Sequence, residues 1–429
     1  MSENSQQQNK LLATKPSWSN FPDGLLRTLV NAYFDYMNPI VPIMDRELTL
    51  KYLESEPSED IYTLVVTLAA VPLKRVRSLT EEYQEPDFRR CLLAEAMRVK
   101  GMSPAFITNP NINCVKTSFF LYLNFCATEE YDVAWYYLQE AITLGRILKI
   151  DNEAAYHNLT PIEDTDRRLL FWGLFVSERG FSIHERKPIV LGRSINLPEP
   201  EKLSIVHREF VPLIQLMSSV DDDFYPLWLN PIAPLDPCAQ MIARMQNKLQ
   251  SAFPADFYFQ SSIQRSNVLI TQPWLLLLLW RLNHQWTTVQ TSPMDSHFPL
   301  YAATTAHRVV SSVTVQDLLA HGPGMRKKLF DITHTLAESI ILQPQLTTGP
   351  DALEKRNILL SLSETVRSIS QDTLNEFRLL ETKVKEALQS HIFTYEQKSN
   401  IPNQAPPGNG PPTPLSDLFS ELYPLANEQ

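Results

Sequence analysis

Residues 131–149 are YDVAWYYLQEAITLGRILK, and residues 160–179 are TPIEDTDRRLLFWGLFVSER. In the first segment apolar residues recur at intervals of three and four, a spacing that predicts a helix with one buried face. The second segment opens with a capping-box pattern, in which Thr160 takes the N-cap, Pro161 the first helical position and Glu163 the third. We therefore predict two consecutive helices at the centre of the fold.

The composition of the chain agrees with a helical fold. Only 11 of the 429 residues are glycine, whereas 32 are proline and 44% are hydrophobic. Glycine-rich phosphate-binding loops are therefore scarce, which argues against a nucleotide-binding α/β enzyme. The prolines fall mainly between periodic segments, as expected for many helices joined by proline-containing loops. The fold class that we predict is all-α, a single large multi-helical regulatory domain with disordered termini.

A proline-rich exit follows the second helix, with ERKPIVL at residues 185–191 and INLPEP at residues 195–200. The order of the two helices and this exit resembles the middle homology region of fungal zinc-cluster transcription factors. The candidate structural motif that carries the resemblance consists of Arg167, Arg168, Trp172, Arg179 and Pro188. One departure occurs at the family's Gly-Arg-Pro element, where a charged residue replaces the glycine. Beside the motif, aspartates at 164 and 166 are expected to form ion pairs with the two adjacent arginines.

The resemblance covers most of the chain, roughly from Phe21 to Leu388. Near the N-terminus, Tyr33-Phe34 and the run PIVPI at residues 39–43 are similar to the opening of the family's domain. Three later runs, KLQSAFP at 248–254, VLITQPWL at 268–275 and HGPGMRKKLFDI at 321–332, resemble the fungal regulators of starch, maltose and xylan use. The resemblance implies an inhibitory or effector-sensing domain that restrains or releases an activation segment in response to a small metabolite.

The four cysteines do not form a metal-binding pattern, because Cys91, Cys114, Cys126 and Cys238 include no Cys-x2-Cys pair. The DNA-binding segment of the family holds two zinc ions with six closely spaced cysteine thiolates, and residues 1–20 contain none. We therefore expect no zinc, no other cofactor and no direct sequence-specific DNA binding in this chain. Two explanations stay open: a regulator that lacks the zinc cluster, and an incomplete gene model.

The charge of the chain points in the same direction. A net charge of −10 disfavours non-specific nucleic-acid binding by the chain as a whole. Short basic runs lie at residues 74–77, 89–90 and 326–328. We predict that they lie on solvated helix faces, with a nuclear-import signal as the alternative. The most apolar run, residues 268–282, is interrupted by Gln272-Pro273 and is too short to span a bilayer, so no membrane partner is expected.

Three stretches contain residue types that are common in catalytic or metal sites. His184-Glu185 has no second histidine at helical spacing, so a zinc-protease motif is excluded. Residues 221–223 are three aspartates without further carboxylates nearby, and we predict a solvated loop rather than a cation site. The run HGPG at 321–324 is similar to an esterase oxyanion loop, but no Gly-x-Ser-x-Gly elbow exists, so we place it at a helix start. We predict no catalytic residue and no enzyme activity.

Composition divides the chain into a disordered leader (1–18), the helical domain (19–395), a proline-rich linker (396–414) and an acidic-hydrophobic tail (415–429). Acidic residues interspersed with large hydrophobic ones are typical of an activation segment that folds against a coactivator. The candidate residues of this activation segment are Asp417, Leu418, Phe419, Glu421, Leu422 and Tyr423. A C-terminal helix that docks on its own domain is the alternative.

Together these observations predict a nuclear transcriptional regulator of a metabolic or biosynthetic gene set. Its expected partners are a DNA-binding transcription factor or a coactivator and a small-molecule effector, and a homodimer or heterodimer is compatible with this role. The alternative function is an α-helical protein-interaction scaffold without a role in transcription.

Overall fold

The structure is a computed structural model that describes residues 15–83, 87–229, 236–286, 297–343, 351–370 and 374–399. Every regular element in these residues is helical, which confirms the all-α prediction. Contacts between residues divide the chain into two compact units. Unit 1 comprises Met1–Asn230, Ala252–Val268 and Ser312–Lys327, and unit 2 comprises Pro231–Ser251, Leu269–Ser311 and Lys328–Gln429.

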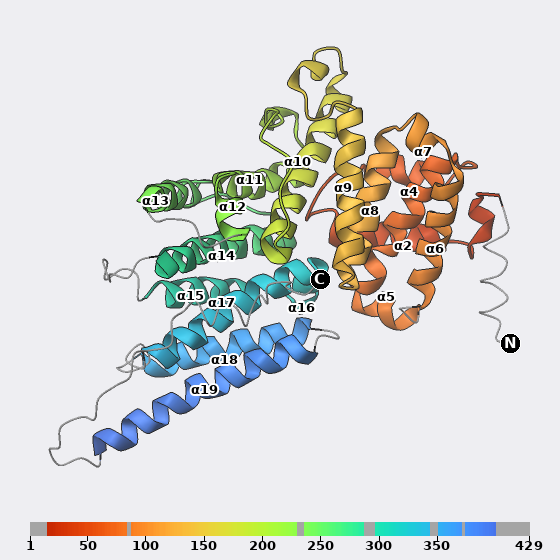
Figure 1. The fold of residues 1–429 in the computed structure, drawn as a ribbon. Helices are drawn as coiled ribbons and strands as arrows, with labels where there is room; N and C mark the ends of the chain where they lie inside the picture. The colour runs from red at the N-terminus through yellow and green to blue at the C-terminus, as the bar shows by residue number, and fades with distance from the viewer. Residues whose placement is uncertain are drawn as a thin grey trace, which may run out of the picture. The chain divides into compact units, whose positions relative to one another are not determined.

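Unit 1 contains most of the short helices (Figure 1). Its elements are η1 (Trp18–Asn20), α2 (Leu25–Ala32), the π-helical η2 (Tyr33–Met37), α3 (Arg46–Tyr52), α4 (Glu59–Ala70), η3 (Pro72–Lys74), α5 (Arg77–Glu82), α6 (Asp87–Met102), α7 (Ala105–Thr108), α8 (Ile112–Ala127), α9 (Tyr131–Ile147), η4 (Glu153–Tyr156), α10 (Pro161–Glu185), η5 (Pro200–Lys202), α11 (Ile205–Ser219), α12 (Phe224–Leu229) and α16 (Val315–Ala320). Two further helices, α14 (Ser262–Trp286) and α17 (Pro323–Leu342), contribute residues to both units.

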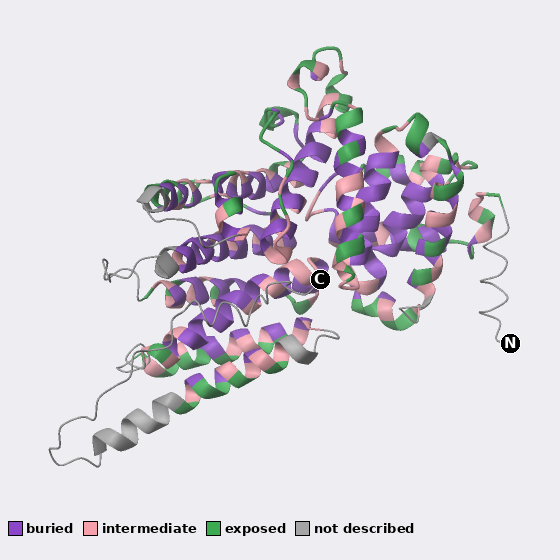
Figure 2. Cartoon of the chain, viewed as in Figure 1, coloured by how far each residue is buried: buried purple, intermediate pink, exposed green. Residues whose placement is uncertain are grey.

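Helices α4 and α8 form the centre of unit 1. Every residue from Tyr62 to Ala70 in α4 and from Cys114 to Tyr122 in α8 is buried. A helix that is buried on all sides must be surrounded by other helices. Accordingly, α4 packs against α2, α6 and α8, and α8 also packs against α9. Figure 2 shows buried residues along these helices, as well as in other helices of the chain.

The turn at residues 39–43 packs against the middle of α10. A Cβ atom at Gly173 of α10 would lie 2.8 Å from Val41 Cγ1 and 3.0 Å from Ile43 Cγ2. Real Cβ atoms do not approach side chains so closely, so the turn depends on glycine at this position. The PIVPI run and α10, which both carry the family resemblance, therefore pack together.

Two segments from beyond residue 250 complete unit 1. The backbone N–H of Ser261 donates to Glu209 of α11 at 3.2 Å, and the Gln316 side chain donates to the carbonyl of Arg75 at 2.9 Å. After α16, Gly322 adopts a φ of +66°, and its Cα faces the Arg75 guanidinium, because a Cβ atom here would lie 3.1 Å from Arg75 Nε. The HGPG run therefore forms the turn that ends α16 and starts α17 at Pro323, as predicted.

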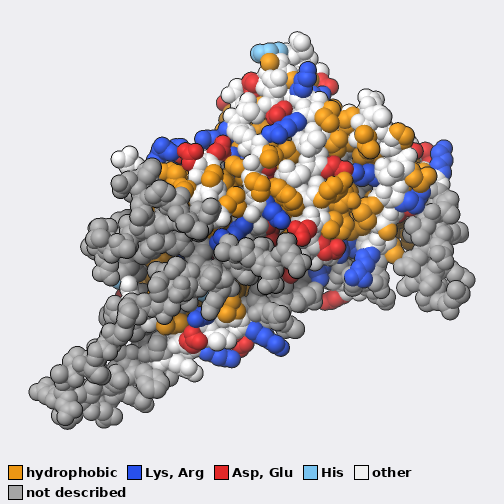
Figure 3. All heavy atoms as spheres, viewed as in Figure 1, with side chains coloured by type: hydrophobic (Ala, Val, Ile, Leu, Met, Phe, Trp, Pro, Cys, Tyr) orange, Lys and Arg blue, Asp and Glu red, His pale blue; other side chains and the backbone are white. Residues whose placement is uncertain are grey.

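The prediction that the basic runs lie on solvated helix faces is wrong for four residues. Arg75, Arg89, Arg326 and Lys328 are each at most 8% exposed. Their burial depends on acceptors far along the chain: Arg326 contacts Glu129 at 2.6 Å, and Arg75 donates to the carbonyl of Leu123 at 3.2 Å. On the face of the molecule in Figure 3, the exposed basic side chains are interspersed with acidic and hydrophobic ones.

Unit 2 consists of longer helices, namely α13 (Asp236–Gln250), α15 (Phe298–Val310), α18 (Ala352–Ile369), α19 (Leu374–Ser399) and the greater part of α14 and α17. The α14 segment from Trp274 to Leu279 is wholly buried, although it follows Pro273 inside the same helix. Helix α18 packs against α15 and α19. None of the described helices has both the length and the apolar character needed to cross a membrane.

Candidate functional site

The N-terminus of α10 forms as the sequence predicts. Thr160 is the N-cap, and its Oγ1 accepts a hydrogen bond from the backbone N–H of Glu163 at 3.3 Å. In return, the Glu163 carboxylate accepts the backbone N–H of Thr160 at 3.0 Å. This capping box satisfies two N–H groups that the first turn leaves unpaired. It fixes where α10 starts and therefore which residues face the interior.

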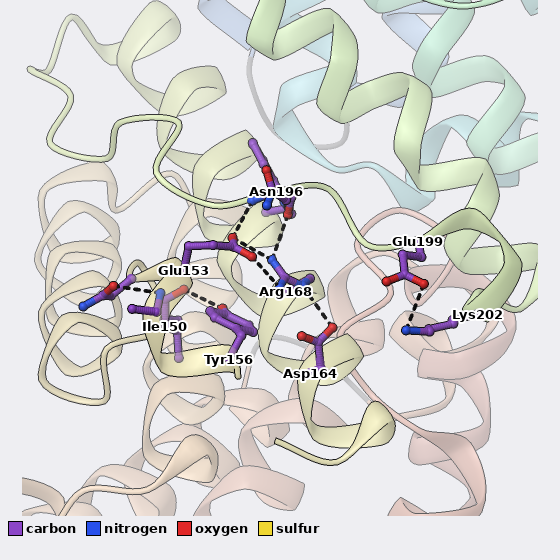
Figure 4. A network of polar contacts seen from close by, with 11 residues as sticks. Ile150, Glu153, Tyr156, Asp164, Arg168, Asn196, Glu199 and Lys202 are labelled. Carbon is purple, nitrogen blue, oxygen red and sulfur yellow. Dashed lines mark hydrogen bonds and ion pairs between the residues drawn. The ribbon is translucent and has the colours of Figure 1, made fainter. Parts of the chain in front are cut away.

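Arg168, two turns into α10, is the centre of a charged network in unit 1 (Figure 4). It forms a bidentate pair with Glu153 of η4 at 2.7 and 2.9 Å, and its Nε contacts Asp164 at 3.0 Å. Its guanidinium also lies 4.2 Å from the ring centroid of Tyr156. Bidentate guanidinium–carboxylate pairs are among the strongest polar contacts in proteins. The hydrogen bonds from Arg168 lower the pKa of Glu153 to about 2.

The same network holds the proline-rich exit. The carbonyl of Asn196 accepts hydrogen bonds from Arg168 and from the indole N–H of Trp172, each at 3.2 Å. The backbone N–H of Asn196 donates to Glu153 at 2.7 Å. Arg168 and Trp172, both predicted as structural, therefore bind the same backbone carbonyl, that of Asn196. Glu153 and Asn196 were not predicted as members of this network: Glu153 lies in no recognised motif, and Asn196 takes part through its backbone, which the INLPEP run does not reveal.

Arg167 lies beside this network without taking part in it. Its side chain is half-buried on α10, whereas the adjacent Arg168 is buried and binds Glu153, Asp164 and the carbonyl of Asn196. Asp166, the other aspartate expected to pair with these arginines, contacts Lys116 of α8 at 2.7 Å. The two expected ion-pair partners therefore separate, with Asp164 on Arg168 and Asp166 on a different helix.

A second network surrounds Arg179, three turns further along α10. Its side chain has no exposed surface, and it contacts Asp222 at 2.6 Å and donates to the carbonyl of Leu191 at 2.9 Å. The guanidinium carbon lies 3.4 Å from the centroid of the Phe175 ring, a stacked cation–π geometry. Burial of a guanidinium is tolerated when a carboxylate and hydrogen-bond acceptors compensate it, and this site supplies both.

Glu178 holds the exit from the other side. Its carboxylate accepts the backbone N–H groups of Val190 and Leu191 at 2.8 and 2.9 Å. Burial raises the pKa of Glu178 despite these hydrogen bonds. The adjacent acid and base at 178 and 179 therefore fix the backbone at residues 190 and 191. The sequence signal was present, since a charged pair in an otherwise apolar stretch requires buried partners, but it does not reveal which residues they are.

The segment held in this way forms one wall of a surface hollow in unit 1. The hollow has a volume of about 260 Å³, and Pro188 lines it together with Ile189, Val190, Leu191, Gly192, Asp222, Tyr225, Pro226 and Leu229. Pro188 and Arg179 were both predicted as structural. Pro188 lines this wall of the hollow, and Arg179 supports the wall from behind by binding the carbonyl of Leu191. A second hollow of about 740 Å³ lies in unit 2 beside α15 and α18.

The aspartate triplet is the predicted solvated loop only in part, because Asp222 and Asp223 are exposed whereas Asp221 is buried. Asp221 is buried and lies 3.8 Å from Arg193, and Asp222 pairs with Arg179. These two ion pairs hold the loop against α10 and the proline-rich exit. In the part of the chain that the structure describes, no three potential metal ligands cluster. The candidate activation segment, Asp417 to Tyr423, lies outside the described residues, as do the last residues of the linker.

Comparison with known proteins agrees with the motifs around α10. The family model of the fungal specific transcription factor domain matches residues 30–205. The chain is 24% identical over 340 residues to the probable sucrose utilization protein SUC1 of Candida albicans, a match that covers 75% of this chain and 65% of that protein. It is therefore similar to just under two thirds of the length of that relative.

Two proteins of Saccharomyces cerevisiae are similar over more of their length. The maltose fermentation regulatory protein MAL13 is 20% identical over 342 residues, which cover 77% of this chain and 71% of that protein. The maltose fermentation regulatory protein YPR196W is 21% identical over 399 residues, which cover 89% and 81%. These matches confirm the resemblance inferred from the sequence motifs. Residues 30–205, which lie within unit 1, are thus similar to the fungal specific transcription factor domain.

Proposed function

We propose that this chain regulates the transcription of sugar-utilisation genes in the nucleus. The observation that carries the proposal is the transcription factor domain together with similarity to the sucrose and maltose proteins over 75–89% of the chain. The similarity extends well beyond the domain itself, so unit 2 is included in the comparison. A regulator, rather than an enzyme, is the function that these relatives support.

In this proposal the contact with DNA comes from a DNA-bound partner. None of the four cysteines in these 429 residues has Cys-x2-Cys spacing, and the net charge is −10. Moreover, four of the basic residues that the sequence offers for phosphate contacts are buried. A net negative charge disfavours contact of these 429 residues with the phosphate backbone. A full-length DNA-binding relative is a suitable partner, and the two chains would then form a heterodimer. Two copies of this chain could also form a homodimer.

The tail at residues 415–429 is proposed as the segment that contacts a coactivator. Leu418, Phe419, Leu422 and Tyr423 supply large apolar side chains, and Asp417 and Glu421 supply the charges between them. Such a segment binds by placing its apolar residues in a groove of the partner. A small metabolite would then control whether the helical domain leaves this segment accessible.

Chromatin immunoprecipitation of the full, tagged chain tests the proposal. We expect enrichment at promoters of sugar-utilisation genes, and we expect it to disappear when the DNA-binding relatives of the host are deleted. Enrichment that persists in their absence would contradict the proposal that a partner supplies the contact with DNA. No enrichment at any promoter would instead favour a protein-interaction scaffold.

A second experiment separates the tail from the helical domain. Residues 401–429 are fused to a heterologous DNA-binding domain, and reporter transcription is measured. We expect activation, and we expect it to be lost when Phe419 and Leu422 are both replaced by alanine. A matched variant with Ser416→Ala and Ser420→Ala should remain active. An inactive wild-type fusion would remove the activation segment from the proposal.

A further inference from the structure

The outer face of α9 carries large apolar side chains. Buried residues hold the inner side of this helix against α8 and α10. On the outer side, Val133 is 38% exposed, Tyr136 60% and Ile147 57%. The solvent face of a helix that packs on a core is ordinarily polar. Exposed apolar side chains that share one face are instead typical of an interaction surface.

These side chains belong to one continuous line of residues, the α9 stripe. The α9 stripe consists of Val133, Tyr136, Glu140, Thr143 and Ile147. Their spacing of three, four, three and four residues is that of the positions at which one helix of a coiled coil contacts another. Figure 2 shows exposed residues along the length of α9, and Figure 3 shows hydrophobic side chains on the same side of the molecule. The geometry of the stripe therefore suits a second helix laid alongside α9.

The charged residue in the middle of the stripe is already compensated. The Glu140 carboxylate accepts hydrogen bonds from Lys100 Nζ of α6 and from Ser118 Oγ of α8, each at 2.7 Å. Only 22% of its side chain is exposed. Val133 and Ile147 lie seven residues to either side of it, so the stripe is symmetric about this point. A two-fold axis between identical chains requires a surface that is complementary to itself in this way.

The charges at the two ends of α9 are opposite in sign. Asp132 lies at the N-terminal end with 93% of its side chain exposed. Arg146 and Lys149 are exposed at the C-terminal end. An antiparallel copy of α9 brings Asp132 next to these cations and aligns the two helix dipoles favourably, whereas a parallel copy brings like charges together. The charges of α9 therefore select a second copy in the antiparallel orientation.

The proline-rich exit lies along one side of the stripe. Lys187 contacts Asp132 at 3.1 Å, and the carbonyl of Val190 accepts a hydrogen bond from Arg146. Val190 is 40% exposed, and Pro188 is exposed as well. The exit therefore extends the apolar surface beyond α9 itself.

We propose that the α9 stripe is a homodimer interface, in which α9 of a second copy packs antiparallel about a two-fold axis near Glu140. The Val133 end of each helix then lies beside the Ile147 end of the other. The helix has 17 residues and is about 25 Å long, which is small for an obligate dimer interface. We therefore expect a micromolar dissociation constant and an equilibrium with the monomer. This interface belongs to the homodimer named in the proposed function, and to that extent the assignment rests on it.

Sedimentation velocity of the full purified chain tests the interface. We expect the mass to rise with concentration from the 49.2 kDa of the monomer to twice that value. Ile147→Asp buries a charge in the stripe on association and should leave a monomer at every concentration. Ile162→Asp is the matched control, because Ile162 of α10 is 82% exposed and lies outside the stripe. It should dimerise as the wild type does, and circular dichroism should show wild-type helix content for both variants.

An exchange of charges tests the antiparallel orientation. Asp132→Arg or Arg146→Asp alone places like charges side by side across the interface and should weaken dimerisation about tenfold. Both substitutions in one chain restore opposite charges between antiparallel copies, so the dissociation constant should return to near the wild-type value. The two positions lie about 21 Å apart along the same helix, so such a recovery arises between chains and not within one.

The interface is wrong if the wild-type chain stays monomeric, if Ile147→Asp dimerises normally, or if Ile162→Asp dissociates the dimer equally. A double variant that stays as weak as the single ones would overturn the antiparallel pairing. Because sedimentation needs no DNA, a dimer without promoter enrichment would contradict the regulatory role alone. Promoter enrichment of a chain that stays monomeric would contradict the interface alone.

Discussion

Units 1 and 2 both bury cations, but they compensate them differently. In unit 1, Arg168 and Arg179 contact the carboxylates of Glu153 and Asp222 at 2.7 and 2.6 Å. In unit 2, Lys328 donates to the neutral hydroxyl of Thr271 at 2.7 Å and lies 5.5 Å from the centroid of the Trp274 ring. Burial accordingly lowers the pKa of Lys328 to about 7.

The difference shows that a buried cation does not have one fixed effect on stability. Each arginine of unit 1 binds a carboxylate and a backbone carbonyl of the proline-rich exit, so its removal leaves these acceptors without their partner. Removal of Arg179 also leaves the fully buried Glu178, 4.0 Å away, without its counter-charge. For Lys328 the loss of hydration dominates, since burial lowers its pKa to about 7, and its replacement by an apolar side chain removes that cost. We therefore expect substitutions in the two units to change the free energy of unfolding with opposite signs.

The largest expected effect is that of Arg179→Met. Loss of the guanidinium leaves Asp222 and the carbonyl of Leu191 without their buried partner, and we expect the free energy of unfolding to fall by about 3–5 kcal/mol. Urea denaturation of the full chain, followed by circular dichroism, measures it. Arg167→Met is the matched control on the same helix and should stay within about 0.5 kcal/mol of the wild type. Equal effects of the two variants would refute the distinction.

Lys328→Met should have the opposite sign. At pH 6 the lysine is charged and buried, so we expect the variant to be more stable than the wild type by about 1–4 kcal/mol. The neighbouring Lys327 forms an ion pair with Glu185 and lies 4.1 Å from the Tyr131 ring centroid. Lys327→Met should therefore be neutral or destabilising. A destabilised Lys328→Met protein would show that unit 2 compensates this cation as well as unit 1 does.

The pH dependence of the stability difference between the wild type and Lys328→Met is a further test. The folded-state pKa of Lys328 is about 7, below its ordinary value of 10.5, so between these pH values the unfolded state binds more protons. Stability of the wild type relative to Lys328→Met should therefore rise with pH in this window, by up to about 1.4 kcal/mol per pH unit. Below pH 7 the difference should be constant. A difference that does not change between pH 7 and pH 9 would contradict the lowered pKa.

Arg168→Lys tests the geometry of the unit 1 network rather than its charge. The lysine keeps the positive charge but loses the planar fork that binds both Glu153 oxygens, so we expect a loss of about 1–2 kcal/mol. Arg167→Lys should have almost no effect. Thermal unfolding of both variants at neutral pH measures the difference between them. Equal melting temperatures of Arg168→Lys and Arg167→Lys would contradict the role of the planar fork.

The smallest expected effect concerns the turn after α16. Gly322→Ala places a Cβ atom at a φ of +66°, 3.1 Å from Arg75 Nε, and should destabilise the protein by about 1 kcal/mol. Gly101→Ala, in a helix with open space around it, should instead stabilise by about 0.5–1 kcal/mol. Urea midpoints distinguish the two signs. If both variants are stabilised, the turn is not constrained by its backbone conformation.

Features that depend on neighbouring residues could be predicted from the sequence. The capping box of α10 formed as predicted because Thr160 and Glu163 are only three residues apart and satisfy each other's backbone groups. The structural role of the HGPG run likewise follows from local preferences. The family resemblance was also visible, since it depends on the order of short motifs.

Features that depend on distant residues could not be predicted. Arg326 is buried because it pairs with Glu129, 197 positions earlier, and Asp222 is held against α10 because it pairs with Arg179, 43 positions earlier. Pro273 remains inside α14, where the apolar packing that follows it outweighs the break that proline favours. Local preference is at most a few kcal/mol, so burial decides in such cases.

The sequence by itself determined that this chain is all-α, where α10 begins, and which family its motifs resemble, because helix periodicity and capping are short-range properties. The tertiary structure decided which charged residues are buried, which acids neutralise them, and that the 188–192 segment and α12 enclose a hollow. These features arise from pairs of groups brought together only by folding, whose desolvation must be compensated by whichever partner the packing supplies.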